Sequence, residues 1–348
     1  MGTLQELLED FVETDAAPGA AALVARDGEL EIASAGDMAA DSIVRIASIT
    51  KPITAAAVML LVGEGRVQLD DPIGRWLPEL ASPQVVRTPQ SALDDLVPAS
   101  RAVTVEDLLT FRAGWGFPDD FSVPAAKELL QKLPVFGARE TPDEWLKTLA
   151  GLPMLAQPGE AWLYNTCSDI QGVLISRVSG RSLPEFLDER IFEPLGMSDT
   201  GFSIPAEKLD RLPPYHSPNA MPDSLWTVPP VFPSGAGGLV STLADWNRFA
   251  QMLLAGDGFL SDAAIRLMTT DHLTQAQRDD STVFLEGAGW GFGGSVGSDG
   301  RYGWVGGTGT TAHVVPATGT AGILFTQVQM TGPAPTPVMR RFWNHAFG

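Results

Sequence analysis

Segments with a strand pattern stand near both ends of the chain, and this arrangement constrains the fold more than any other feature. Near the N-terminus, Ala20–Ala25 and Leu30–Ala35 are apolar runs joined by Asp27-Gly28, a pair typical of tight β-hairpin turns. Strands are also expected near the C-terminus, over Gly289–Val296, Arg301–Val305, Thr311–Pro316 and Ala321–Met330. Pairing of the first hairpin with the last strands would form one antiparallel sheet.

Helices are expected to surround this sheet. Amphipathic patterns over Gln5–Val12 and Thr336–Phe347 predict terminal helices that flank it. Between the two groups of strands, prolines are frequent and no alternating pattern indicates a sheet. Helices are predicted there over Val105–Phe111, Pro142–Leu149, Ser168–Ser179 and Leu183–Ile191. The sequence therefore predicts an α+β protein, in which residues 1–69 and 235–348 form a discontinuous α/β domain and residues 70–234 a mainly helical one.

Charge and composition exclude several functions. The formal net charge of −19 would repel a phosphate backbone, so nucleic acid is not an expected partner. No apolar run approaches bilayer length, and the first residues carry acids where a signal peptide carries Lys or Arg. We therefore expect a cytoplasmic protein without membrane contact. The single cysteine, Cys167, fits a reducing compartment, and the histidines are too scattered to predict a metal site.

A Ser-x-x-Lys sequence opens a long apolar helix, predicted over Ser48–Gly65. Residues three apart share a helix face, so the hydroxyl of Ser48 and the amine of Lys51 would be neighbours. A desolvated lysine can accept the serine proton, and N–H groups at the helix start can stabilise an oxyanion. In a structural interpretation, Ser48 caps the helix and Lys51 extends to solvent. The apolar helix, and the absence of another lysine before Lys127, favour the catalytic one.

Several ordered blocks accompany this motif. They cover Ala47–Thr54, Thr104–Gly114, Gln157–Thr166, Ile191–Thr200 and Gly237–Thr242. These blocks resemble signatures of the serine β-lactamase-like hydrolases, a superfamily that includes class C β-lactamases, D-amino-acid peptidases and family VIII carboxylesterases. The resemblance spans most of the chain. It implies a β-lactamase/transpeptidase-like fold with Ser48 as nucleophile and Lys51 as its base.

The resemblance also assigns a role to Tyr164, which follows Pro158-Gly159-Glu160. It implies that the phenol of Tyr164 works with Lys51. An unperturbed tyrosine has a pKa of about 10, so we expect nearby positive charge to lower it for work as a base. A core tyrosine with a buried hydroxyl is the structural alternative.

The strand over Gly303–Gly309 resembles the Trp-x-Gly form found in the esterase branch of the superfamily, here Trp304, Val305 and Gly306. The resemblance implies that Gly307 donates the second oxyanion N–H, whereas a glycine-rich strand turn is the structural alternative. Trp304 stands where relatives carry a lysine that would bind a carboxylate. Thr166 stands where they carry an asparagine. Both differences favour neutral esters over β-lactam amides.

Other residues could be mistaken for a site. Ser295 lies in a Gly-x-Ser-x-Gly sequence, but a strand rather than a helix is expected after it, so we interpret it as a hairpin residue. Cys167 is interpreted as a buried small hydrophobe because no histidine is near it in sequence. The aromatic residues after Gly114 fit either an acyl pocket or the core; they are Trp115, Phe117 and Phe121.

The sequence thus predicts a serine carboxylesterase that acts on a small ester through an acyl-enzyme on Ser48, with no metal or organic cofactor. Ser48 would lose its proton to Lys51 or Tyr164. Three alternatives stay open: an acyltransferase, a weak β-lactamase or D-peptidase, and a non-catalytic penicillin-binding-like module. The substrate-binding residues expected beside the catalytic ones are Gly307, Trp304, Gly306 and Thr166. The sequence does not set the oligomeric state.

Overall fold

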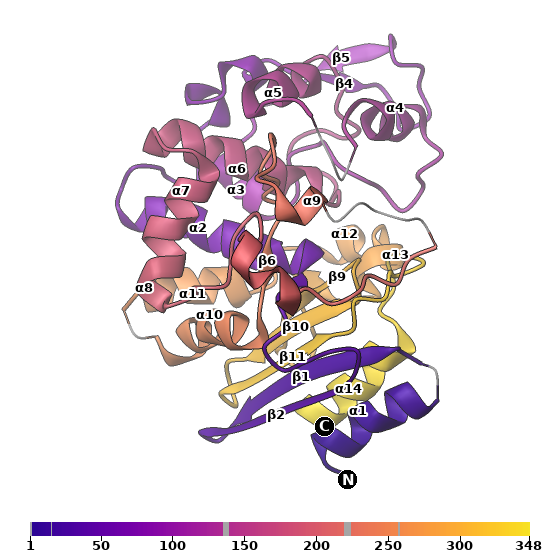
Figure 1. Cartoon of the computed structure of the whole chain (residues 1–348). Helices are drawn as coiled ribbons and strands as arrows, with labels where there is room; N and C mark the ends of the chain where they lie inside the picture. Colours follow the sequence, from indigo (N-terminus) through magenta and orange to yellow (C-terminus); the bar gives the residue numbers. More distant parts are fainter. Residues whose placement is uncertain (1, 15, 135–138, 219–223, 257) are drawn as a thin grey trace.

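A seven-stranded antiparallel sheet forms the centre of the structure, a computed structural model that describes all residues except 1, 15, 135–138, 219–223 and 257 (Figure 1). The strand order is β2-β1-β11-β10-β9-β8-β7. The strands span Gly19–Arg26 (β1), Glu29–Gly36 (β2), Gly289–Trp290 (β7), Ser295–Val296 (β8), Tyr302–Gly306 (β9), Thr310–Val315 (β10) and Thr320–Phe325 (β11).

The two ends of the chain pair directly within this sheet. β1 lies between β2 and β11, with Ala21 opposite Phe325. The β1–β2 hairpin turns at Asp27 and Gly28, whose φ angles of 54° and 79° give the two-residue turn that matches the twist of the strands. The predicted α+β fold, built on an antiparallel sheet flanked by terminal helices, is confirmed.

Helices cover both faces of the sheet (Figure 1). α1 (Leu4–Glu13) and α14 (Pro337–Phe347) pack on one face, and α10 (Leu243–Ala255) packs on the other. α1 begins at a capping box, in which the side chain of Thr3 accepts from the Glu6 N–H and the Glu6 carboxylate accepts from the Thr3 N–H. These caps and the apolar faces of the helices fix the layers that support the site.

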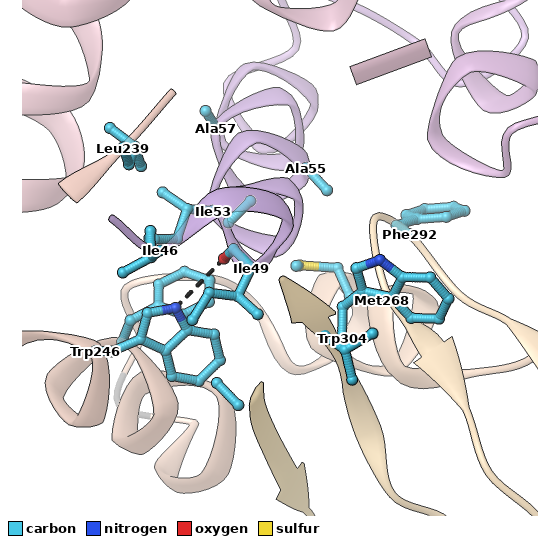
Figure 2. Packing of buried hydrophobic residues seen from close by; sticks show 14 of the residues in the cluster. Ile46, Ile49, Ile53, Ala55, Ala57, Leu239, Trp246, Met268, Phe292 and Trp304 are labelled. Carbon is cyan, nitrogen blue, oxygen red and sulfur yellow. Dashed lines mark hydrogen bonds between the residues drawn. The ribbon is translucent and has the colours of Figure 1, made fainter. Parts of the chain in front are cut away.

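The helix α2 (Lys51–Gly63), which follows Ser48 of the Ser-x-x-Lys motif, is deeply buried. Side chains from separate segments surround its first turns, among them Leu239, Trp246, Met268 and Phe292 (Figure 2). The indole N–H of Trp246 donates to the carbonyl of Ile49 at 3.3 Å, which ties α10 to the start of α2. Within the described residues, no helix combines the length and apolarity that crossing a membrane would require.

The described part of residues 70–234 contributes helices but no strand of the seven-stranded sheet. The helices are α3 (Val105–Leu109), α4 (Pro124–Lys132), α5 (Pro142–Ala150), α6 (Thr166–Ser179), α7 (Leu183–Leu187), α8 (Glu193–Leu195) and α9 (Ser224–Thr227). The expectation of no sheet here is wrong in one place, because β4 (Gln84–Val86) and β5 (Leu96–Pro98) form an antiparallel ribbon. Strands of three residues are too short to show an alternating pattern.

The remaining elements connect these two groups. They are β3 (Val44–Arg45), β6 (Val240–Ser241), α11 (Asp262–Thr269), α12 (Gln275–Asp279) and α13 (Thr282–Leu285). β3 and β6 pair with each other just before the nucleophile candidate, with Arg45 opposite Val240. This short ribbon joins the segment that leads into α2 to the segment that leads into α10.

The predicted strand Gly289–Val296 is wrong as a single element. It is divided into β7 and β8 by a turn at Gly293, whose φ is 77°. A Cβ atom on Gly293 would lie 2.6 Å from the carbonyl oxygen of Lys51, so the turn packs directly on α2. Ser295 belongs to the hairpin that results, and its hydroxyl donates to the Gly303 carbonyl at 3.0 Å. Its interpretation as a hairpin residue is therefore confirmed.

Candidate active site

Ser48 lies in a tight turn that precedes α2. Residues Ala47–Thr50 form a 3-10 turn and the α-helix begins at Lys51, which corrects the expected position of Ser48 within the helix. The neighbouring Ala47 has a φ of 46°, in the left-handed region that residues with a side chain rarely adopt. Thr310 holds the turn by donating from its hydroxyl to the Ile46 carbonyl at 2.8 Å. Surrounding contacts thus maintain a strained backbone beside the serine.

Lys51 reaches back from the first turn of α2 to the serine hydroxyl. Its Nζ lies 2.8 Å from Ser48 Oγ and 2.6 Å from the carbonyl oxygen of Ala236. Burial of the side chain lowers the pKa of Lys51 to about 7, although attraction by the Asp169 carboxylate raises it. A large fraction of the amine is therefore neutral at pH 7. In that form it can donate to Ala236 and accept the proton of Ser48.

Tyr164 is held beside this pair by its backbone and its hydroxyl. Its N–H and carbonyl both bond to Phe117, each at 2.9 Å. The phenol oxygen accepts from Trp304 Nε1 at 2.7 Å, and the hydroxyl also bonds with Ser48. The Nζ atom of Lys51 lies over the Tyr164 ring, 4.6 Å from the ring centroid.

The expected lowering of the Tyr164 pKa is wrong. Burial raises the pKa of this phenol to about 12, and its hydrogen bonds with Ser48 and Trp304 only partly oppose the effect. Lys51 does not reverse it, because a lysine with a pKa of about 7 carries only part of a positive charge at neutral pH. Tyr164 is therefore protonated at rest, which fits a proton donor and leaves Lys51 as the base.

Asp169 is a neighbour of Lys51 that sequence reasoning missed. Its carboxylate accepts from the Ser234 hydroxyl at 2.7 Å and from the Ala236 N–H at 3.1 Å. Burial raises the pKa of Asp169 to about 6, whereas these bonds and the attraction of Lys51 lower it. The available signal was an acid in the first turn of α6, in a helix whose first ten residues are all buried.

Gly306, the last residue of β9, and Gly307, which follows it, differ in how much free space surrounds them. A Cβ atom on Gly306 would lie 2.5 Å from the Ile46 carbonyl and 3.3 Å from the Ala47 side chain, so a side chain there would displace the turn. A Cβ atom on Gly307 would meet nothing within 4 Å. Gly307 lines the same pocket as Ser48.

A pocket of about 340 Å³ opens in front of Ser48. It is lined by Ser48, Phe117, Phe121, Tyr164, Asn165, Phe284, Trp304, Val305, Gly307 and the segment Met330–Pro333. Of the three aromatic residues considered for such a pocket, Phe117 and Phe121 line it, whereas Trp115 is buried in the core. Thr166 is buried at the start of α6, and the residue that lines the pocket is its neighbour Asn165.

Cys167 does not contribute a second nucleophile. Its side chain is fully buried, and burial raises the pKa of the thiol to about 12. Its sulfur lies 3.9 Å from the Trp115 carbonyl oxygen. Among those same residues, no three His, Cys, Asp or Glu side chains are placed to hold a metal ion.

A serine hydroxyl, a partly neutral amine and a protonated phenol therefore meet beside an aromatic pocket. Such an arrangement defines the chemistry of acyl transfer through a serine. The chain belongs to the Beta-lactamase family, whose sequence model matches residues 4–340. This finding confirms the superfamily resemblance and, with the esterase relative described below, indicates a serine hydrolase.

Known proteins similar to the chain include esterases. Protein Rv1367c of Mycobacterium tuberculosis is 40% identical over 293 residues, which cover 78% of this chain and 71% of that protein. Esterase EstB of Burkholderia gladioli is 31% identical over 312 residues, covering 79% of this chain and 74% of the esterase. The solved structure of EstCE1, described as a hydrolase with promiscuous acyltransferase activity, has the same fold, with a TM-score of 0.83, 22% identity and coverage of 99% and 97% of the two chains.

Proposed function

We propose that this protein is a serine carboxylesterase that cleaves small, neutral carboxylic esters through an acyl-enzyme on Ser48. The observation that carries the proposal is the 2.8 Å contact between Ser48 Oγ and the Nζ of Lys51, a fully buried amine with a pKa of about 7. Such an amine can deprotonate the hydroxyl at neutral pH. The 31% identity to an esterase supports the choice of ester as the scissile bond.

In the first half-reaction, Ser48 attacks the ester carbonyl and its proton passes to Lys51. The N–H groups of Ser48 and Gly307 stabilise the oxyanion of the tetrahedral intermediate. When this intermediate collapses, Tyr164 gives its proton to the departing alkoxide and regains one from the Lys51 ammonium. The indole N–H of Trp304, 2.7 Å from the phenol oxygen, stabilises the phenolate that forms briefly.

In the second half-reaction, water attacks the acyl group on Ser48. Lys51 removes the proton of this water, and when the second intermediate collapses Tyr164 gives its proton to the Ser48 alkoxide and regains one from the Lys51 ammonium. The carboxylic acid then departs from the pocket. Every proton is handled by side chains of this chain, so the proposed cycle requires no metal or organic cofactor.

The character of the pocket favours neutral substrates over β-lactams. Of the described residues that line it, none is lysine or arginine, so no fixed cation faces the carboxylate of a penicillin or a peptide C-terminus. Phe117, Phe121 and Phe284 form an aromatic wall, with Phe121 lying 5.9 Å from each of the other two rings. Aromatic rings of this kind suit an apolar acyl or alcohol group.

Acyl transfer is the second candidate. Thr331 and Gly332, which line the pocket, are exposed to solvent, and an alcohol that entered the pocket could replace water in the second half-reaction. Product analysis with added acceptor alcohols separates the two reactions. Mainly acid product at high alcohol concentration supports a hydrolase, and mainly transferred ester supports an acyltransferase.

The proposal is tested with a panel of p-nitrophenyl esters and a chromogenic cephalosporin, applied to the wild type and to Ser48→Ala. We expect turnover of short and medium esters by the wild type, little turnover of the cephalosporin, and loss of both in the variant. Unchanged esterase activity in Ser48→Ala would contradict the proposal. Absence of labelling of the folded wild type by a fluorophosphonate would favour a non-catalytic binding module.

A further inference from the structure

We propose that Asp169 is a positioning residue for the base of this reaction: its carboxylate fixes the backbone that holds Lys51 and supplies the negative charge that acts on the Lys51 amine. The inference rests on the proposed function, because it concerns how Ser48 is activated. Asp169 touches neither the pocket nor the serine; it acts through Lys51.

The geometric part of the proposal is a clamp on residues 234–236. From α6, Asp169 accepts hydrogen bonds from the Ser234 hydroxyl and the Ala236 N–H. From α2, Thr54 donates to the Gly235 carbonyl at 2.8 Å. The carbonyl oxygen of the same residue, Ala236, accepts a hydrogen bond from Lys51 Nζ at 2.6 Å. The carboxylate thereby sets the position of the oxygen that orients the lysine.

The packing around this clamp leaves little freedom. A Cβ atom on Gly235 would lie 2.5 Å from the carbonyl oxygen of Ser168 and 3.0 Å from the methyl group of Thr54. The segment is therefore pressed between α2 and α6. Loss of the Asp169 bonds would leave the Ala236 N–H with the Ser234 hydroxyl oxygen, 3.2 Å away, as its remaining acceptor, which weakens the hold on this segment.

The electrostatic part follows from the neighbours of Lys51. Tyr164, whose ring centroid lies 4.6 Å from Lys51 Nζ, and Cys167, which is close to Asp169, are both protonated at neutral pH, because burial raises the pKa of each to about 12. Asp169 is the carboxyl whose attraction raises the pKa of Lys51 against the effect of burial. Without that charge, burial alone would lower the pKa of Lys51 further. The carboxylate thus holds the pKa of Lys51 high enough for the amine to accept the serine proton. The pKa is still low enough for part of the amine to be neutral at pH 7.

The test compares Asp169→Asn with the wild type by the pH dependence of Ser48 labelling with a fluorophosphonate. Labelling of the wild type should rise with pH through about 7, as Lys51 loses its proton. Removal of an opposite charge should move this rise to lower pH by about one unit. Because a pKa near 7 leaves about a tenth of the amine neutral at pH 6, the ratio of rates at pH 6 and pH 8 should increase about fivefold.

Asp245→Asn is the matched control, because Asp245 is also a buried carboxylate. It accepts hydrogen bonds from the Asp199 N–H and the Thr200 hydroxyl, and not from the segment that contacts Lys51. It should leave the pH dependence of labelling unchanged. An Asp169→Asn protein that folds, with thermal unfolding near that of the control, and keeps the wild-type pH dependence would overturn the proposal.

Ser234→Ala provides a second variant if Asp169→Asn does not fold. Loss of the Ser234 hydroxyl bond raises the pKa of Asp169, so less of the carboxylate is charged and the labelling curve should move in the same direction by a smaller amount. An unchanged curve would again contradict the proposal. Labelling does not require ester turnover, so a wild type that is labelled but cleaves no ester would refute the proposed function alone.

Discussion

The indole N–H of Trp304 donates to the phenol oxygen of Tyr164 across 2.7 Å. An indole nitrogen can only donate, so the phenol oxygen is the acceptor and the phenol's own proton is left to point toward Ser48. A neutral donor therefore stands where relatives of the lactamase type are expected to carry a lysine. Trp304 contributes one wall of the pocket and also sets the direction in which Tyr164 gives its proton.

Trp304→Phe should keep the wall of the pocket and remove this donated bond. A hydrogen bond to a charged group contributes roughly 1.5–3 kcal/mol, so we expect kcat to fall by about 10- to 100-fold with a smaller change in KM. Steady-state kinetics on a p-nitrophenyl ester provide the measurement.

Trp290→Phe is the control for that substitution. Trp290 packs against Trp304 with ring centroids 4.9 Å apart, but its buried indole N–H has no hydrogen-bond partner among the described residues. The Trp290 variant should therefore retain near wild-type kcat. Equal losses in both variants would mean that the Trp304 bond has no special role.

The rate should depend on pH through Lys51. The pKa of the buried amine is lowered to about 7, so the fraction of neutral base increases as pH rises from 6 to 8, and kcat/KM should rise with it. The raised pKa of Tyr164, about 12, predicts no loss of the proton donor below pH 9. A profile that is flat between pH 5.5 and 8.5 would exclude Lys51 as the titrating base.

Lys51→Arg tests the same assignment by substitution. A guanidinium stays protonated at every pH that a protein tolerates, so it cannot accept the serine proton. We expect a loss of at least about a hundredfold in kcat/KM, without recovery at high pH. Recovery of activity above pH 9 in this variant would point to a different base.

β9 approaches the turn that carries Ser48 closely at Gly306 but not at Gly307. We therefore expect alanine substitutions at these two glycines to affect stability differently. In Gly306→Ala, the new methyl group would lie 2.5 Å from the Ile46 carbonyl, and we expect a loss of about 1–3 kcal/mol in stability together with loss of esterase activity. In Gly307→Ala, the methyl group meets no atom within 4 Å, so the thermal unfolding temperature should stay within a degree or two. Thermal denaturation of both variants is the measurement, and equal destabilisation would argue against this contact.

Much of the site followed from local sequence patterns. Ser48 and Lys51 are three residues apart, so either a 3-10 turn or an α-helix brings their side chains together. Tyr164 was found through the resemblance of its surrounding block, and its distance from Ser48 in the chain gave no geometric information. The pairing of the first hairpin with the last strands was predictable because the segments between them are poor in strand patterns.

The rest depends on tertiary packing, which a local pattern does not contain. Asp169 acts on Lys51 only because α6 packs on α2 and because residues 234–236 hydrogen-bond to both helices. The pKa of Tyr164 was predicted in the wrong direction because burial outweighs the effect of a partly charged neighbour. The turn at Gly293 interrupts a predicted strand because it rests on the Lys51 carbonyl, a contact between distant parts of the sequence.

The proposed mechanism depends on acylation of Ser48, and the acyl-enzyme can be trapped. The wild type is mixed with a p-nitrophenyl ester, quenched in acid within the burst of p-nitrophenol release, digested and mapped by mass spectrometry. We expect an added acyl mass on the peptide that contains Ser48, and no such mass in Ser48→Ala. An acyl group found on another residue, or rapid ester turnover by Ser48→Ala, would contradict the mechanism.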